Sequence, residues 1–274
     1  MPPVTIHCVR HAQGFHNISV TNHAIHDPML TQLGEEQCKS LAKNFPFMDR
    51  VDAVIASPMK RTVYTALYSF APAIRDKRLK VYALPELQET SDLPCDTGSK
   101  VSDLETEFRG QPVDLSYMYT PPAKAWNSKL GKWSATASAV DDRARIAREW
   151  LYSRPEKEIV VVTHGGFLHY LTEDWMEKSS NGPGTGWANT EYRSYTFSSN
   201  PKSGRPVLIE TPQSRARRLG NEKPLTRAET TNLQRVESKQ KAEEEKAYQK
   251  ASGIQAKLKL KRKERDLGGY AYGV

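Results

Sequence analysis

The sequence has little cysteine and no long hydrophobic run. Its 274 residues contain three cysteines, Cys8, Cys38 and Cys95, and none of them belongs to a CxxC pair. An odd number at such wide spacing excludes a disulfide framework and gives no cysteine-based metal site. No stretch approaches the roughly 20 apolar residues of a transmembrane segment, and the apolar run at residues 4–9 starts too early to follow the basic part of a signal peptide. We therefore expect a soluble protein of a reducing compartment, in the cytoplasm with the nucleus as an alternative.

The first 212 residues also lack any excess of charge. The formal net charge of +8 lies entirely in residues 213–274, and the charges of the preceding residues balance. An excess of basic residues suggests binding to nucleic acid or another polyanion, and here that suggestion applies only to the tail. Any anion selectivity in residues 1–212 must come from locally placed arginines and histidines. We predict one catalytic domain at residues 1–212, followed by a basic tail at residues 213–274.

Short apolar runs predict the strands of an α/β fold. Three such runs are rich in β-branched residues, which is typical of buried strands in a largely parallel sheet. They cover residues 4–9, 51–56 and 159–163. Helical patterns separate them and cover residues 31–45, 57–70 and 141–152. The alternation predicts a three-layer α/β/α sandwich, with helices on both faces of a mostly parallel sheet.

Local signals place the starts of two helices and an irregular excursion. Thr31 can cap the first helix, and Ser57 followed by Pro58 is typical of the start of the second. Residues 89–139 are rich in Pro, Gly, Ser and Asp, which predicts an irregular segment over one end of the sheet. Segments of that length often carry substrate contacts.

The tail at residues 213–274 is predicted to be a highly charged helix, in part flexible. Its apolar seam spans only two heptads, fewer than a coiled coil needs. The basic cluster at residues 257–265 is compatible with a nuclear-import signal, a nucleic-acid contact or a membrane-surface contact. We expect a solvated helix that makes weak polyanion contacts and is dispensable for chemistry.

Polar residues follow the predicted strands where each strand ends. The first run ends in Arg10 and His11, the second leads into Ser57 with Arg61 one turn further on, and the third is followed by His164. Ligands of open parallel sheets bind beyond the carboxyl ends of the strands. The pattern therefore predicts a site with two histidines and two arginines at one edge of the sheet.

This combination of side chains suits a phosphoryl group. Guanidinium groups bind charged phosphate oxygens in a bidentate manner, and a helix N-terminus near Ser57 adds N–H donors. Gly165, which follows His164, lets the main chain approach a ligand closely. Because an unprotonated imidazole is a competent nucleophile at neutral pH, we expect one histidine to attack and the other to stabilise the transition state.

Five short motifs succeed one another between residues 4 and 197. They read Val-Arg-His-Ala-Gln-Gly-Phe-His-Asn, Leu-Thr-Gln-Leu-Gly, Ser-Pro-Met-Lys-Arg-Thr, Leu-Gln-Glu and Thr-His-Gly-Gly, and they begin at residues 9, 30, 57, 87 and 163. This order resembles that of the histidine phosphatase, or phosphoglycerate-mutase-like, superfamily. The first motif, with Pro-Cys-Asp at residues 94–96, is most similar to the plant and fungal phosphoglycerate-mutase-like proteins.

The resemblance implies a role for each matching residue. His11 would be the phosphorylated nucleophile, and Arg10, Arg61 and His164 would form the phosphate pocket. Asn17 would contact a phosphate oxygen or the substrate. The substrate would be a small phosphorylated metabolite, and the reaction would need neither a metal nor another cofactor.

The resemblance also implies a general acid, Glu89, which would protonate the leaving oxygen and later activate water. Glu86 lies three residues earlier and is the alternative acid, although the Leu-x-Glu pattern favours Glu89.

Residues 12–14 read Ala-Gln-Gly where the mutases of the superfamily have Gly-Glu-Ser, which favours hydrolysis. The alternatives are a phosphomutase or a member recruited to another reaction, and a regulatory protein that acts through its tail.

Several residues near the motifs have both a functional and a structural interpretation. His16 is a candidate pocket residue, and a simple loop hydrogen bond explains it equally well. Cys95 and Asp96 are candidates for shaping specificity, with a structural turn as the alternative. His23 and His26 match neither a helix-borne HExxH pattern nor a zinc spacing, so we predict no metal site.

Overall fold

The computed structural model describes residues 4–174, 185–198, 204–221, 223 and 225–268. Its strands are β1 (Thr5–Arg10), β2 (Ala53–Ala56), β3 (Val81–Ala83), β4 (Val113–Asp114), β5 (Glu158–Thr163), β6 (Tyr192–Phe197) and β7 (Leu208–Glu210). They form one sheet in the order β4-β3-β2-β5-β1-β6-β7. Neighbouring strands from β4 to β1 are parallel, and β6 and β7 add to the β1 edge in antiparallel orientation. The prediction of a mostly parallel sheet is confirmed.

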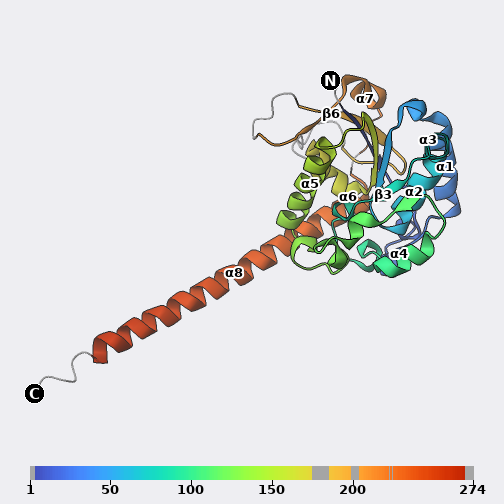
Figure 1. Cartoon of the computed structure of the whole chain (residues 1–274). Helices are drawn as coiled ribbons and strands as arrows, with labels where there is room; N and C mark the ends of the chain where they lie inside the picture. Colours follow the sequence, from blue (N-terminus) through green and yellow to red (C-terminus); the bar gives the residue numbers. More distant parts are fainter. Residues whose placement is uncertain (1–3, 175–184, 199–203, 222, 224, 269–274) are drawn as a thin grey trace, which may run out of the picture.

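Helices cover both faces of the sheet (Figure 1). They are α1 (Gln32–Asn44), α2 (Lys60–Ser69), α3 (Ala71–Lys77), α4 (Val101–Glu107), α5 (Ala137–Tyr152), α6 (Gly165–Thr172), α7 (Pro212–Arg218) and α8 (Arg227–Gly268). One large hydrophobic core joins the sheet to α1, α2, α3 and α4, and a second joins it to α5, α6 and the first turns of α8. The three-layer α/β/α arrangement is therefore confirmed.

Alternation along the central strand explains why two cores form. In β5, Val160 and Val162 belong to one core, whereas Ile159 and Val161 belong to the other. Successive side chains of a strand point to opposite faces of the sheet. A continuous run of aliphatic residues therefore becomes a strand that is buried on both sides, as the sequence predicted.

The predicted helix starts are confirmed in one case and wrong in the other. Thr31 caps α1, because its hydroxyl accepts a hydrogen bond from the Gly34 N–H. By contrast, α2 begins at Lys60, with Met59 at the capping position and no side-chain cap. The Ser57 hydroxyl lies 2.9 Å from Nε2 of His164. A contact with a residue distant in sequence has replaced the local capping bond that we expected.

The excursion at residues 89–139 is mostly irregular, as predicted, but it also contains α4 and the short strand β4. Trp126 lies within this segment and is fully buried. The Trp126 carbonyl accepts a hydrogen bond from the Gln88 side chain, and Trp126 belongs to the same core as β2 and β3. Parts of the predicted excursion, including Leu104, Met118 and Trp133 besides Trp126, therefore belong to the hydrophobic core.

The first turns of α8 are not solvated, which corrects our expectation for this part of the tail. Leu233 and Val236 are buried in the core beside α5 and α6. Asp92 forms ion pairs with Arg235 and Lys239, which lie on the same stretch of helix. Beyond this docked part, α8 projects away from the body (Figure 1). The domain boundary at residue 212 stays a prediction about which part of the chain folds as a unit. Packing against the core continues beyond this residue, because Leu233 and Val236 of α8 belong to it.

Leu233→Ala should lower the free energy of unfolding by about 2–5 kcal/mol, because a buried leucine that is truncated loses apolar contacts and leaves a cavity. Chemical denaturation followed by circular dichroism measures this change. Leu219→Ala is the matched control, since Leu219 is 71% exposed, and it should change the stability by less than about 0.5 kcal/mol. Equal stability of the two variants would show that α8 does not dock in solution.

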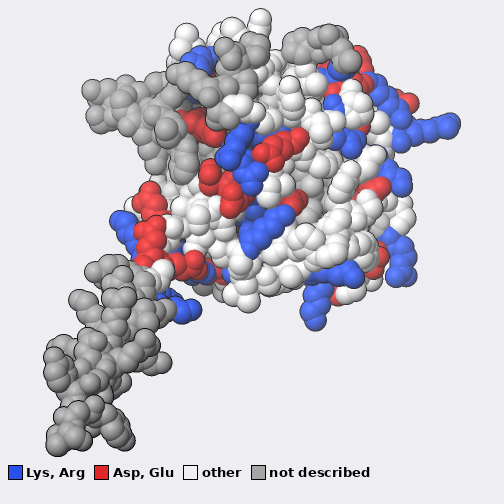
Figure 2. All heavy atoms as spheres, turned by 60° about the vertical axis from the view of Figure 1, so that its left-hand side comes forward, with Lys and Arg blue, Asp and Glu red and all other residues white. Residues whose placement is uncertain are grey.

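Charges on the body are interspersed. In the face shown in Figure 2, lysine and arginine side chains lie among aspartates and glutamates, without a large patch of one sign. The side chains of the basic cluster at residues 257–265 lie outside the described residues, so the polyanion contact stays a prediction.

Within the described part of the chain, no helix combines the length and the apolar character that crossing a bilayer requires.

Candidate active site

The sheet brings the predicted site residues to one edge. Strands β2, β5 and β1 are parallel neighbours, and Arg10 of β1 lies beside Thr163 of β5. His11 and His164 follow these two positions, and their ring centroids lie 5.2 Å apart. Parallel pairing of three adjacent strands thus places two histidines that are distant in sequence side by side.

Hydrogen bonds define the tautomer of His11. Its Nδ1 lies 2.7 Å from the carbonyl oxygen of Ala12, which can only accept, so Nδ1 carries the proton. Nε2 accepts a hydrogen bond of 3.3 Å from Nε of Arg61 and therefore has a lone pair. Burial, and then the charges of Arg61 and Arg10, hold the pKa of His11 well below its usual value. The ring is consequently neutral at physiological pH.

Arg61 joins the parts of the site and is fully buried. Its Nη2 donates to Oδ1 of Asp96 at 3.0 Å and lies 3.0 Å from Nδ1 of His164. Its Nη1 donates to the Cys95 carbonyl oxygen at 2.7 Å. The structure therefore brings Cys95 and Asp96, two candidate pocket residues, into contact with the guanidinium group.

The second histidine is also neutral. Nδ1 of His164 faces the Arg61 guanidinium, which only donates, so the ring proton sits on Nε2 and points to the Ser57 hydroxyl. Burial and the charge of Arg61 hold the pKa of His164 well below its usual value. Both rings are therefore without a permanent charge of their own.

Glu89 lies in the same cavity and is held by main-chain donors. Its Oε1 accepts hydrogen bonds from the N–H groups of Thr90 and Phe167 at 2.8 and 3.0 Å, and Oε2 accepts one from Gly166 at 3.3 Å. A Cβ atom on Gly166 would lie 2.7 Å from Oε1, so this approach requires glycine. Burial, with the charge of Asp96, raises the pKa of Glu89.

Glu86, the alternative acid, lies elsewhere. It forms an ion pair with Lys132 at 2.7 Å and lines a different pocket, next to α5. Of the two carboxylates, only Glu89 lines the cavity that contains His11.

Two buried nitrogen atoms of the cavity lack hydrogen-bond partners among the described residues. They are Nε of Arg10 and Nδ1 of His16, and both residues line the cavity. Buried polar atoms are normally satisfied, so these two positions suit an anionic ligand. Asn17 lines the same cavity, while its Oδ1 accepts a hydrogen bond from the Gly14 N–H at 3.0 Å.

The start of α8 closes this cavity, a contact that we did not predict from the sequence. Glu229 is 2% exposed, and its carboxylate accepts hydrogen bonds from the N–H groups of Trp187 and Thr226 at 3.0 and 2.6 Å. Asn232, one turn further, donates to Asp96 at 3.5 Å. A signal was present, since Thr226 and Glu229 have the spacing of a capping box.

Glu229 is ionised in this environment. Burial opposes its charge, but the ion pair with His169, at 3.5 Å, and the charge of Arg10 lower its pKa to about 2. Burial likewise opposes the charge of His169, yet the hydrogen bond with Asp174 and the ion pair with Glu229 raise its pKa to about 9. A carboxylate of α8 thus stands beside an arginine that is expected to bind phosphate.

The cavity itself is small and opens into a larger groove. It has a volume of about 20 Å³, which is room for about one water molecule. A phosphoryl group therefore enters only when side chains rearrange or the start of α8 moves outward. The adjoining groove has a volume of about 340 Å³ and shares Arg10, His16 and Asn17 with the cavity.

The groove lies between two segments that are distant in sequence. Ile18 and Val20 line one side and are 59% and 60% exposed. Thr226 and Thr231, at the start of α8, line the other side.

Within the described residues, no three His, Cys, Asp or Glu side chains are arranged as a metal ion would require.

Comparisons of the sequence identify relatives. Residues 6–204 match the family model of the histidine phosphatase superfamily (branch 1). A probable phosphatase of Schizosaccharomyces pombe is 33% identical over 167 residues, covering 59% of this chain and 74% of that protein. Phosphoglycerate mutase-like protein 1 of Arabidopsis thaliana is 31% identical over 201 residues, covering 61% of this chain and 70% of that protein.

Comparison of the structure finds a related fold. The ecdysone phosphate phosphatase from Bombix mori, solved in complex with tungstate, superposes with a TM-score of 0.51. It is 16% identical in sequence, and the match covers 76% of this chain and 93% of that one. At this level of identity the likeness concerns the fold alone.

Proposed function

Because this chain belongs to the histidine phosphatase superfamily, we propose that it hydrolyses small phosphorylated metabolites through a phosphohistidine on His11 and without a metal ion. The observation that carries the proposal is the lone pair of His11 Nε2, which faces Arg61 inside a buried cavity. Phosphatase-named relatives support an enzyme of this kind. The nucleophile has the required protonation state before any substrate arrives.

In the first step, Nε2 of His11 attacks phosphorus and forms a P–N bond while the P–O bond to the leaving group breaks. The electron pair of that bond stays on the leaving oxygen, which takes the proton of Glu89. Arg10, Arg61 and His164 donate hydrogen bonds to the transferring oxygens. For His164 this requires that the Nε2 proton, which points to the Ser57 hydroxyl in this structure, turns toward the ligand.

In the second step, the Glu89 carboxylate takes a proton from water as the water oxygen attacks phosphorus. The P–N bond breaks, its electron pair returns to Nε2, and inorganic phosphate leaves. Glu89 is protonated again, so the enzyme is ready for the next cycle. The leaving alcohol would occupy the groove beside Ile18 and Thr226, which accommodates a small organic body.

The pH dependence of kcat/KM tests this division of roles. His11 must be neutral, and its lowered pKa keeps the ring neutral even at pH values well below those at which histidine usually titrates. Glu89 must be protonated, and its raised pKa keeps the carboxyl protonated to higher pH than is usual for glutamate. We therefore expect activity on an alkyl phosphate to be highest at acidic pH and to fall as pH rises through the pKa of Glu89.

Glu89→Gln should remove this alkaline decline from the profile, because the amide does not titrate. Ionisation of the substrate is the same for both enzymes, so the comparison isolates the protein group. An unchanged decline in Glu89→Gln would assign the titration to another group and would count against Glu89 as the acid.

A phosphomutase is the second candidate, since relatives bear the name phosphoglycerate mutase-like. Residues 12–14, Ala-Gln-Gly, differ from the Gly-Glu-Ser that the mutases of the superfamily have at these positions. Hydrolysis is tested by following inorganic phosphate release alongside the isomeric composition of a phosphorylated metabolite. Release of phosphate without isomerisation is the expected result.

A further inference from the structure

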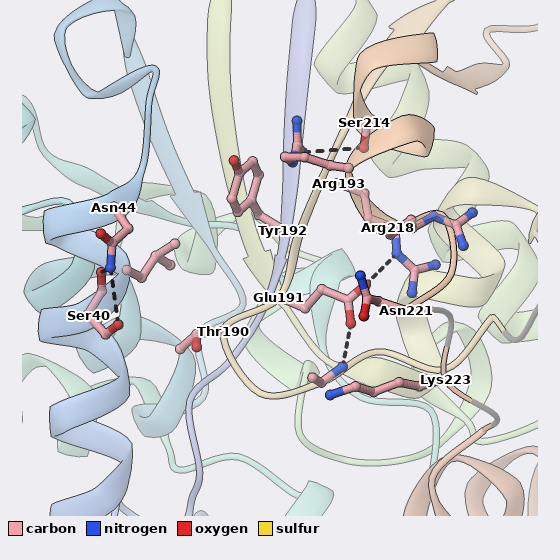
Figure 3. Close-up of a pocket in the computed structure, with 13 residues that line it drawn as sticks. Ser40, Asn44, Thr190, Glu191, Tyr192, Arg193, Ser214, Arg218, Asn221 and Lys223 are labelled. Carbon is pink, nitrogen blue, oxygen red and sulfur yellow. Dashed lines mark hydrogen bonds and ion pairs between the residues drawn. The ribbon is translucent and has the colours of Figure 1, made fainter.

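A second pocket lies away from the catalytic cavity, between α1 and α7 (Figure 3). Its volume is about 390 Å³, which is within the usual range of small-molecule sites. Its walls are the end of α1, the turn at residues 188–191, the start of β6, α7, and residues 221 and 223. We name it the α1–α7 pocket. None of the predicted catalytic residues lines it.

The positive charge of the α1–α7 pocket is only partly neutralised. Arg193 is paired with Glu191 at 2.8 Å, and Arg218 is paired with Glu210 at 2.8 Å. Arg217 and Lys223 also line the pocket, and among the described residues neither of them forms an ion pair. Two cations are therefore left to attract an anion.

The pocket also offers an apolar wall. Leu41 of α1 and the ring of Tyr192 line it. Tyr192 is held in place by Phe45, whose ring centroid lies 4.9 Å away in an edge-on arrangement. The Arg217 guanidinium lies 4.4 Å from the centre of the Tyr192 ring. A cation fixed over an aromatic ring, next to an aliphatic side chain, suits a ligand that is both planar and anionic.

The wall of this pocket is physically connected to the catalytic centre. The Thr190 N–H donates to the Arg10 carbonyl oxygen at 3.0 Å, and the Arg10 N–H donates to the Glu191 carbonyl oxygen at 3.1 Å. The Asn189 side chain donates to the His11 carbonyl oxygen at 2.9 Å. The turn at residues 188–191 thus contacts the pocket on one side and the backbone of the nucleophile on the other.

We propose that the α1–α7 pocket binds a small amphipathic anion, a planar apolar body that carries one carboxylate, sulfonate or phosphate group, and that this ligand modulates the catalytic centre. Arg217 and Lys223 bind the anionic group, and Leu41 and Tyr192 contact the apolar body. The hydrogen bonds of the turn at residues 188–191 transmit the effect of binding to Arg10 and His11. The two sites are then coupled through one short segment.

The fluorescent anion 8-anilinonaphthalene-1-sulfonate is a suitable probe, since it combines two aromatic groups with one sulfonate. Titration of the full chain should give saturable fluorescence. Arg217→Glu/Lys223→Glu should weaken this binding about tenfold or more, because two charge-assisted contacts become repulsive. The matched control is Lys100→Glu/Lys124→Glu, which makes the same change of net charge on exposed lysines elsewhere and should bind as the wild type does.

Saturating orthovanadate, which occupies a phosphate site, separates the two pockets. The probe should remain bound in its presence, with an altered affinity. On the wild type and on the control, the probe should change kcat/KM for p-nitrophenyl phosphate by about fivefold or more, with half-saturation at its own dissociation constant. The Arg217→Glu/Lys223→Glu variant should show no such change.

Three results would overturn the proposal: binding that survives the charge reversal, full displacement by orthovanadate, or saturated binding with unchanged turnover. The binding measurements need no catalysis. Failure of the proposed phosphatase activity would therefore be recognised separately, as absence of turnover without the probe.

Discussion

His11→Ala should lower the rate of phosphate release by about 10³-fold or more, since removal of a nucleophile eliminates the covalent route. The ring is buried and makes few polar contacts, so the fold should persist. His26→Ala is the matched control, because His26 is an exposed histidine of the same region, and it should retain normal activity.

The intermediate provides an independent readout of the same prediction. Wild-type protein quenched in alkali during turnover should carry one phosphoryl group on His11, detectable by mass spectrometry, and acid should remove it because P–N bonds are acid-labile. The His11→Ala protein should carry none. Near-normal activity of that variant on the best substrate would refute a phosphohistidine mechanism.

Glu89→Gln should have an effect that depends on the leaving group. An alkyl phosphate needs a proton on its departing oxygen, so its turnover should fall by about 10²–10⁴-fold. Turnover of p-nitrophenyl phosphate, whose leaving group is stable as an anion, should fall by less than about tenfold. The ratio of the two losses is the measurement, because a general loss of structure lowers both rates alike.

Glu86→Gln is the matched control for this experiment. The Glu86 carboxylate is paired with Lys132 outside the catalytic cavity, so neither substrate should be affected much. If the two substrates lost equal activity in Glu89→Gln, Glu89 would have only a structural role through its bonds to Thr90 and Phe167. Selective loss in Glu86→Gln would transfer the role of the acid to Glu86.

The strands, and the residues that follow their carboxyl ends, were predictable from the sequence because they depend on local pattern and on the geometry of parallel sheets. The positions of Arg10, His11 and His164 follow directly from where buried aliphatic runs end. The start of α2 was not predictable in this way. Ser57 has the side chain of a cap, but its hydroxyl contacts His164, which is 107 residues away in sequence.

Docking of α8 was missed for a similar reason. Leu233 and Val236 form a very short apolar stripe in a segment whose other residues are mostly polar or charged. Its ion pairs involve Asp92, which belongs to the irregular segment whose conformation the sequence did not reveal. The partners of a charged helix are set by tertiary contacts, whereas composition indicates only that such a helix can be solvated.

The capping box at the start of α8 links helix formation to access of substrate. Thr226 and Glu229 exchange hydrogen bonds that begin the helix, and the same Glu229 carboxylate lies beside the phosphate cavity. Fraying of this first turn would therefore also remove the Glu229 carboxylate from the wall of the cavity. Substitution of Thr226 would shift the fraction of molecules that can accept substrate, although its side chain takes no part in bond making or breaking.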